Sequence, residues 1–171
     1  MSDPRSTMSL PPHTLPGTPG SRLRLKPGLA RTGAVDGGWW PASWDLPAEI
    51  PGLVAAFPAA AGEVWRVGFG RSRWDVVPPR TRGWADGKRI GLDGFAAFAA
   101  DVVWVVTSIT GNAPIFLVVV PPDTAPDVAA DVLARAGAAD NLEGPADLLA
   151  DCRPPTSATT PAEPALAASH G

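Results

Sequence analysis

The sequence has few of the residues on which most enzyme mechanisms rely. Histidine occurs only at His13 and His170, near the two ends of the chain. The region expected to fold therefore offers no imidazole for a Ser/His/Asp or Cys/His arrangement and no histidine metal ligand. The single cysteine, Cys152, cannot form an internal disulfide, which agrees with a reducing compartment. We predict a protein that is not an enzyme and uses no cofactor or metal.

Long apolar runs and phosphate-binding motifs are missing as well. No uninterrupted apolar stretch reaches the length of a membrane-spanning helix, and turn-forming residues stand where a signal peptide would have its apolar segment. Neither a Walker lysine pattern nor a Gly-x-Ser-x-Gly motif occurs. The lack of a membrane-spanning segment and of a signal peptide predicts a cytoplasmic location. Carboxylate catalysis by Asp36, Asp45 or Asp75 is the enzymatic alternative, although an aspartate near glycine is more often a turn or cap residue.

Composition divides the chain into a central region and two arms. Residues 1–21 and 152–171 are rich in proline and small polar residues, and they contain too little apolar surface to offset the entropy of ordering. We therefore expect a disordered N-terminal arm, a disordered Pro/Ala-rich tail and a single domain over residues 22–151. The net charge of −3 is concentrated toward the C-terminal end, since basic and acidic residues nearly balance over 22–136.

Alternating polar and apolar residues predict several short strands. In Arg22–Lys26 this alternation directs Leu23 and Leu25 toward a core and the basic residues toward water. Asp86-Gly87 and Gly111-Asn112 are the expected turns of two hairpins, because these residue types tolerate positive φ. The unbroken apolar runs beside the second turn predict central strands that are covered on both faces. The further strands are expected at 64–69, 74–77, 81–85, 88–92, 102–110 and 115–120.

Two helices are expected to flank these strands. Ser43 or Asp45 is the expected N-cap of the first, but Pro51 and Pro58 predict a kink or two short pieces. Thr124 is the expected N-cap of the second helix, which should stop at a glycine near residue 137. The prediction is an α+β domain, with a twisted antiparallel sheet of about six strands and two helices packed on one face, in the order β-α-β-β-β-β-β-α.

Tryptophan is concentrated in residues 37–46, which read Gly-Gly-Trp-Trp-Pro-Ala-Ser-Trp-Asp-Leu. In an extended segment, consecutive side chains point to opposite faces, so one tryptophan can fill the core while its neighbour lies near the surface. A binding surface is one interpretation of this cluster, and plain core that covers the open end of the sheet is the other. The candidate binding residues are Asp36, Trp39, Trp40, Trp44, Asp45, Arg71, Arg73 and Trp74.

Basic residues are concentrated in the strands expected over residues 66–89, with tryptophans interleaved. Such a sheet face can hold phosphates and stack bases. Alternation alone, however, also places polar residues on a solvated face, and the domain is far from strongly basic. We therefore do not expect nucleic acid to be the partner. The basic residues concerned are Arg66, Arg71, Arg73, Arg80, Arg82, Lys88 and Arg89.

Several short motifs recur in a characteristic order: Lys26-Pro27-Gly28, Asp36 before the tryptophan segment, Arg73-Trp74-Asp75 and Val119 to Thr124. In this order they resemble the actinobacterial family of domains of unknown function numbered 5994 (DUF5994), roughly from Arg22 to Ala136. The chain departs from that pattern at Trp44, Pro51 and Pro58. The resemblance brings no catalytic assignment with it.

Two hypotheses from different classes follow. The leading one is a non-enzymatic binding or protein-interaction module that presents a Trp-rich surface to a protein or small ligand. The alternative is a nucleic-acid-binding sheet that uses the basic strands over residues 66–89. Whether Arg71, Arg73, Arg80 and Arg82 share one exposed face distinguishes the two.

Overall fold

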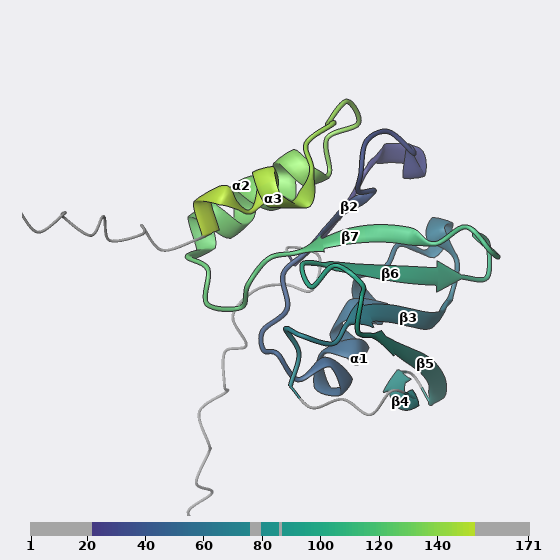
Figure 1. Ribbon diagram of the computed structural model, residues 1–171. Coiled ribbons are helices and arrows are strands. Elements are labelled where there is room, and N and C mark those ends of the chain that lie inside the picture. The colour runs from purple at the N-terminus through teal and green to yellow at the C-terminus, as the bar shows by residue number, and fades with distance from the viewer. Residues whose placement is uncertain (1–21, 76–79, 86, 153–171) are drawn as a thin grey trace, which may run out of the picture.

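A mixed sheet of seven strands forms the centre of the part of the chain that the structure describes (Figure 1). The structure is a computed structural model in which residues 22–75, 80–85 and 87–152 are described, with backbone alone for 80–85. The predicted arms, apart from Cys152, lie outside these residues. The strands are β1 Leu23–Leu25, β2 Gly37–Trp39, β3 Val64–Gly70, β4 Arg80–Ala85, β5 Lys88–Phe95, β6 Val102–Thr107 and β7 Ile115–Val119, in the spatial order β1-β2-β7-β6-β3-β5-β4.

The predicted α+β class is confirmed, but two strand pairs depart from the antiparallel arrangement. β2 runs parallel to β7, and β3 runs parallel to β5. Strand β2 was not predicted, because a three-residue segment with two glycines carries no alternation. The strand expected at 74–77 is not formed at Trp74 and Asp75, which lie in a bend, and its other two residues are outside the described ranges.

The hairpin predicted at residues 86–87 is confirmed. The second hairpin is formed as well, but β6 ends at Thr107 and β7 begins at Ile115, so its connection is longer than the two-residue turn expected at Gly111-Asn112. β4 and β5 pair antiparallel up to Ala85 and Lys88, so their connection has two residues, with Gly87 at φ 72°. β6 and β7 also pair antiparallel, and Gly111 in their connection has φ 56°. A glycine relieves the strain of positive φ at both places. β7 and β6 lie third and fourth in the strand order, which makes them central as expected.

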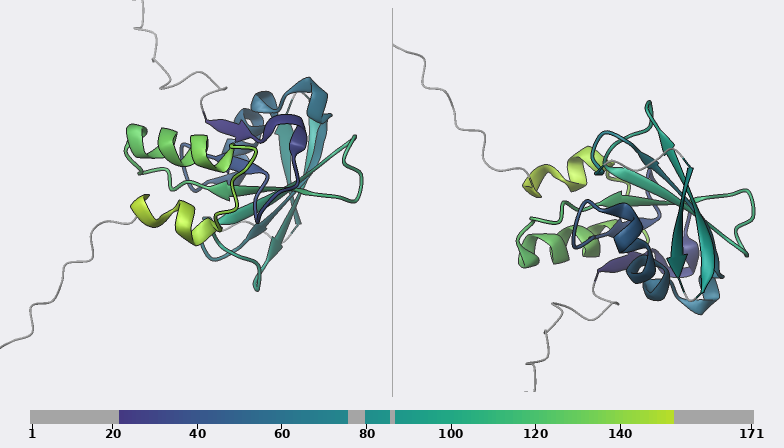
Figure 2. Two further views of the ribbon diagram at one scale, coloured as in Figure 1. Left: turned by 90° about the horizontal axis from the view of Figure 1, so that it is seen from above. Right: turned by 90° about the horizontal axis from the view of Figure 1, so that it is seen from below.

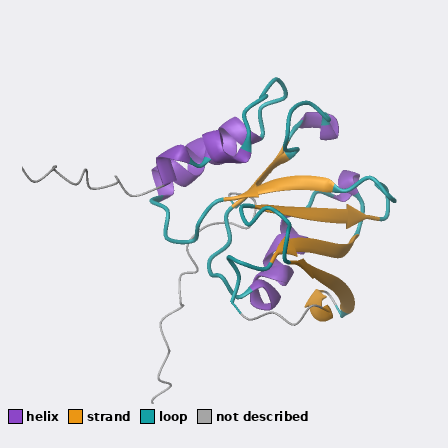
Figure 3. Cartoon of the chain, viewed as in Figure 1, coloured by secondary structure: helices purple, strands orange, loops and turns teal. Residues whose placement is uncertain are grey.

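The main helices cover opposite faces of the sheet, not one face as predicted. Figure 2 shows α1 and α2 at separate places beside the sheet. Helix α1, Leu46–Ala56, packs in one cluster with Leu117, whereas helix α2, Pro126–Ala136, packs in a second cluster with Val118. Neighbouring residues of a strand point to opposite faces, so the two helices must lie on different sides of β7. The short helix α3, Pro145–Leu148, joins the second cluster. Figure 3 shows α1 and the α2–α3 pair as separate groups of helices.

The ends of the helices are defined by local side chains and prolines. Asp45 is the N-cap of α1, because its carboxylate accepts a hydrogen bond from the Ala48 amide at 3.2 Å. Pro51 lies inside α1 without splitting it, and the break comes at Pro58, ahead of the 3-10 helix η3, Ala59–Ala61. The N-cap of α2 is Ala125 and not Thr124, since the chain is still extended at Ala125 and Pro126 begins the helix.

None of the helices in the described residues is long enough and apolar enough to span a membrane.

Candidate functional site

Four of the predicted site residues come together beside α1. The rings of Trp39 and Trp74 stack with their centroids 5.6 Å apart, and Trp44 meets Trp74 edge-on at 5.3 Å. The Arg73 guanidinium lies 5.8 Å from the centre of the Trp44 ring. Only 3% of Trp39 and 6% of Trp74 are exposed, and both belong to the core cluster that α1 covers. These two rings therefore pack in the core and offer almost no surface to a partner.

Trp40 points away from this group, as expected for the neighbour of Trp39 in an extended segment. It packs against the cluster that contains α2, and its indole nitrogen donates to the Pro121 carbonyl oxygen at 3.1 Å. The Arg22 guanidinium lies 4.5 Å from the centre of its ring. Trp40 is thus half-buried and fixed on both sides.

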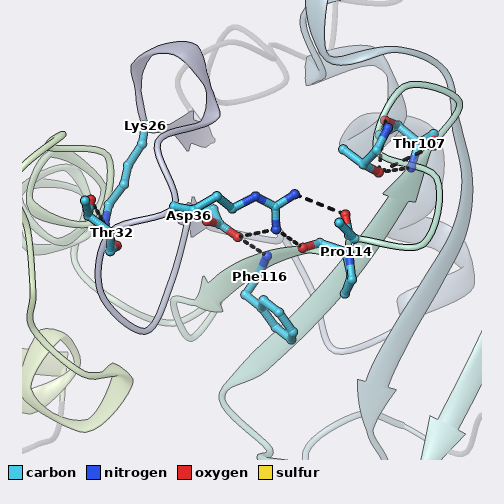
Figure 4. A network of polar contacts seen from close by, with 9 residues as sticks. Lys26, Thr32, Asp36, Thr107, Pro114 and Phe116 are labelled. Atoms are coloured by element: carbon cyan, nitrogen blue, oxygen red, sulfur yellow. Dashed lines mark hydrogen bonds and ion pairs between the residues drawn. The ribbon is translucent and has the colours of Figure 1, made fainter.

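The two acidic candidates anchor the backbone. Asp36 is 5% exposed, and its carboxylate accepts a hydrogen bond from the Phe116 amide at 2.8 Å (Figure 4). Arg31 lies 3.8 Å from the same carboxylate and also donates to the Pro114 carbonyl oxygen at 2.6 Å. Asp36 therefore ties the start of β2 to β7, while Asp45 caps α1. Both contacts serve the fold.

Lys26 is buried, contrary to the expectation that the basic residues of the first strand face water. It is 1% exposed, and its ammonium donates to the carbonyl oxygen of Thr32 (Figure 4). The ammonium also donates to the carbonyl oxygen of Asn141 at 2.9 Å. β1 ends at Leu25, so the alternation that would expose Lys26 no longer applies. The side chain instead joins the loop before β2 to the loop after α2.

The basic residues are largely paired with carboxylates where their side chains are described. Arg73 lies 2.9 Å from Asp101, Arg66 lies 3.4 Å from Asp93, and Lys88 lies 2.6 Å from Glu63. Arg71 is exposed. The side chains of Arg80 and Arg82 are outside the described residues. The question whether they share one exposed face with Arg71 and Arg73 therefore also falls outside the described residues.

An open sheet face, opposite α1, carries a group of aromatic residues that sequence reasoning did not single out. The paired positions Phe116, Trp104, Gly68 and Asp93 form one row across β7, β6, β3 and β5. Trp104 and Phe116 are half-buried, which corrects the expectation that their strands are covered on both faces. The glycine in this row was a usable signal, because a glycine inside a strand often marks a close approach.

This row borders a pocket of about 330 Å³, called the open-face pocket below. Its walls come from β3, β6, β7, the β6–β7 connection and the segment before β6. Trp65, 45% exposed, forms part of the rim. The lining residues are Trp65, Arg66, Phe98, Trp104, Val106, Gly111, Asn112, Pro114 and Phe116.

Groups suited to metal binding or thiol chemistry are scarce in the described ranges. No three or more histidine, cysteine or acidic residues come together there in a way that could hold a metal ion. Burial raises the pKa of the Cys152 thiol, an effect that a nucleophilic cysteine does not show.

Comparison with known proteins places the chain in a family. No curated protein and no solved structure matches it. Residues 22–136 match a family of unknown function, and this range includes all seven strands together with α1 and α2. The chain belongs to that family, DUF5994.

Proposed function

We propose that this protein is a non-enzymatic binding module whose ligand occupies the open-face pocket. One observation carries the proposal: a pocket of about 330 Å³ lies on a sheet face lined by Trp65, Trp104 and Phe116. Ligand pockets in proteins typically measure roughly 300–1,000 Å³ and are lined mainly by apolar and aromatic side chains. The volume favours a small molecule over a protein partner, which would require a much larger contact surface.

Exposed aromatic surface around the pocket supports a binding role. Trp65 and Phe95 are each 45% exposed, and the Phe95 ring lies 6.2 Å from Trp104 and 6.5 Å from Phe98. Contiguous apolar surface of this kind is costly in water and commonly marks an interaction site. The aromatic patch therefore extends beyond the pocket along the same sheet face.

The lining of the pocket supports binding without catalysis. Its polar side chains are Arg66 and Asn112, and the lining includes no carboxylate, thiol or imidazole. General acid–base and nucleophilic catalysis need such groups within hydrogen-bond reach of the substrate. The absence of a cofactor and a cytoplasmic location are part of the same proposal.

The tryptophan segment over residues 37–46 is the binding surface that the sequence suggested. We assign the ligand to the open-face pocket instead, because Trp39 and Trp74 are buried and Trp40 is held by Arg22 and Pro121. A ligand there would have to displace core packing, whereas the open-face pocket is already accessible.

Labelling with 5-fluorotryptophan tests which tryptophans meet a ligand. The full chain contains seven tryptophans, and single Trp→Phe variants at 65, 104 and 39 assign their ¹⁹F resonances. Mixtures of small aromatic compounds should shift the resonances of Trp65 and Trp104 and leave that of Trp39 unchanged. A shift of the Trp39 resonance without shifts of Trp65 and Trp104, or no shift with any compound, would contradict the proposal.

Nucleic-acid binding is the second candidate, and one observation favours it. Trp65 is exposed and carries the Arg66 guanidinium 5.0 Å from its ring centre, a pairing that can stack a base beside a phosphate contact. The ion pairs of Arg66 and Arg73 reduce the attraction for a polyanion. We expect no binding of DNA or RNA at physiological salt in a fluorescence titration. Salt-sensitive micromolar binding that an Arg71→Ala/Arg73→Ala double variant abolishes would establish this alternative.

A further inference from the structure

The Trp104 ring, which lines the open-face pocket, packs over Gly68, a residue without a side chain. Trp104 is paired with Gly68 across β6 and β3. A Cβ at Gly68 would lie 1.9 Å from Cε2 and 2.2 Å from Nε1 of Trp104, so the indole ring rests directly on the bare backbone of β3. The pocket therefore includes the edge or face of a ring that lies along the sheet, which suits a planar ligand better than a branched one.

Arg66 lines the pocket and keeps hydrogen-bond donors of its guanidinium available for a ligand. Asp93 lies 3.4 Å from its Nε atom, a distance longer than that of a strong charge-assisted hydrogen bond. Trp65 supports the guanidinium from one side, with 5.0 Å between the guanidinium carbon and the ring centre. Among the described residues, none accepts a hydrogen bond from the terminal nitrogens Nη1 and Nη2 within 3.5 Å. Two parallel donors are thus left for a ligand.

The positive charge in the lining favours a negatively charged ligand over a positively charged one. Arg66 is the charged residue among those that line the pocket. An aromatic pocket can also hold a cation over its rings, but here a guanidinium already occupies that position over Trp65. A second cation would be repelled, whereas a carboxylate can pair with the two terminal nitrogens in the bidentate geometry that arginine favours.

From these contacts, and building on the proposed function, we infer that the open-face pocket binds a planar aromatic carboxylate. The aromatic ring packs among Trp65, Trp104 and Phe116, and the carboxylate accepts hydrogen bonds from Arg66. Asp93 remains on the Nε side of the guanidinium and orients it. Asn112, also in the lining, can supply a neutral hydrogen bond.

Three probes of nearly equal shape separate the charge preference from general aromatic binding. They are naphthalene-2-carboxylate, the neutral naphthalene-2-carboxamide and the cationic naphthalen-2-ylmethylammonium. Calorimetric titration of the full chain, with the ¹⁹F resonance of Trp104 as a marker of location, gives the affinity for each. We expect the carboxylate to bind about tenfold more tightly than the amide, since a hydrogen-bonded charge pair supplies that much, and the ammonium to bind most weakly.

Two arginine variants test whether Arg66 is the source of the preference. Arg66→Gln should bind the carboxylate no better than it binds the amide. Arg71→Gln is the matched control, because it removes one exposed positive charge outside the pocket lining, and it should retain the preference. The thermal unfolding midpoint of each variant shows whether the fold is retained.

The outcomes distinguish this inference from the proposed function. If all three probes shift Trp104 with similar affinity, the carboxylate inference fails while the binding module stands. If the ammonium binds most tightly, the pocket is a cation cage and the inference fails. If none of the probes shifts Trp104 or Trp65, both the inference and the proposed function fail. A preference that Arg71→Gln abolishes as strongly as Arg66→Gln also overturns the assignment to Arg66.

Discussion

Gly68 and Trp104 face each other on adjacent antiparallel strands, and the indole ring of Trp104 occupies the space where a Gly68 side chain would be. This contact places a large aromatic ring flat on the sheet next to Phe116 and Asp93. It also leaves the sheet face opposite α1 shallow and accessible. The open-face pocket therefore depends on a glycine whose lack of a side chain makes room for the Trp104 ring.

Gly68→Ala should destabilise the domain and deform the pocket. The added methyl group would lie 1.9 Å from Trp104 Cε2, so the indole ring must move away from β3. Overpacking of this kind typically costs about 1–3 kcal/mol. Urea unfolding measures the loss of stability, and near-ultraviolet circular dichroism reports the displaced tryptophan.

Gly91→Ala on the neighbouring strand is the matched control. A Cβ there meets its nearest neighbour, the Trp65 carbonyl oxygen, at 3.8 Å, which is an ordinary contact. This variant should be about as stable as the parent chain. Equal stability of the two variants would show that the Trp104 ring does not prevent a side chain at position 68.

Asp36→Ala should loosen the junction between β2 and β7. The substitution leaves the Phe116 amide without its acceptor and removes the carboxylate beside Arg31. An unsatisfied buried donor costs about 1–3 kcal/mol. Chemical denaturation of Asp36→Ala and of Asp140→Asn, an exposed aspartate, measures the difference. Similar midpoints for the two variants would refute the anchoring role of Asp36.

Local signals in the sequence predicted local structure well. The Asp86-Gly87 turn, the glycine at position 111 and the cap at Asp45 each involve residues within a few positions of one another, and each is confirmed. The pairing of β2 with β7 and of β3 with β5 joins segments that hairpin signals do not connect. Pairing between distant segments depends on which faces the whole chain can bury, so the parallel pairs were missed.

The candidate site shows the same limit. Trp39 and Trp40 were singled out because they are adjacent in sequence, yet burial and a hydrogen bond to Pro121 occupy them in the fold. Trp104 and Phe116 lie in apolar runs that resemble fully buried strands. These two residues are partly exposed because α1 packs on the opposite face of the sheet and α2 packs around Val118, farther along β7.

Lys26→Met should free the loop between β1 and β2. Methionine keeps most of the apolar stem but removes the donors to the carbonyl oxygens of Thr32 and Asn141. Two partly buried acceptors then lose their partner, at a cost of at most about 1–3 kcal/mol each, because water can replace part of the contact. Hydrogen exchange should speed up in residues 27–36 and 138–142 and remain unchanged in β6. Unchanged exchange in both loops would contradict the joining role of Lys26.

The thiol of Cys152 should react slowly with a disulfide reagent in the folded chain. Burial raises its pKa, and nearby Asp151 adds to this effect, although the neighbouring Thr124 hydroxyl lowers the pKa in part. Because the thiolate is the reactive form, a raised pKa lowers the reactive fraction at neutral pH and moves the rise in rate to higher pH.

We expect the reaction with Ellman's reagent at pH 7.5 to be at least several-fold slower for the folded chain than for the chain unfolded in urea. Glutathione measured in both solutions corrects for the effect of urea on the reagent. Equal corrected rates would mean that Cys152 is freely accessible and that the chain around η4, Ala150–Cys152, does not pack against α2 as the structure describes.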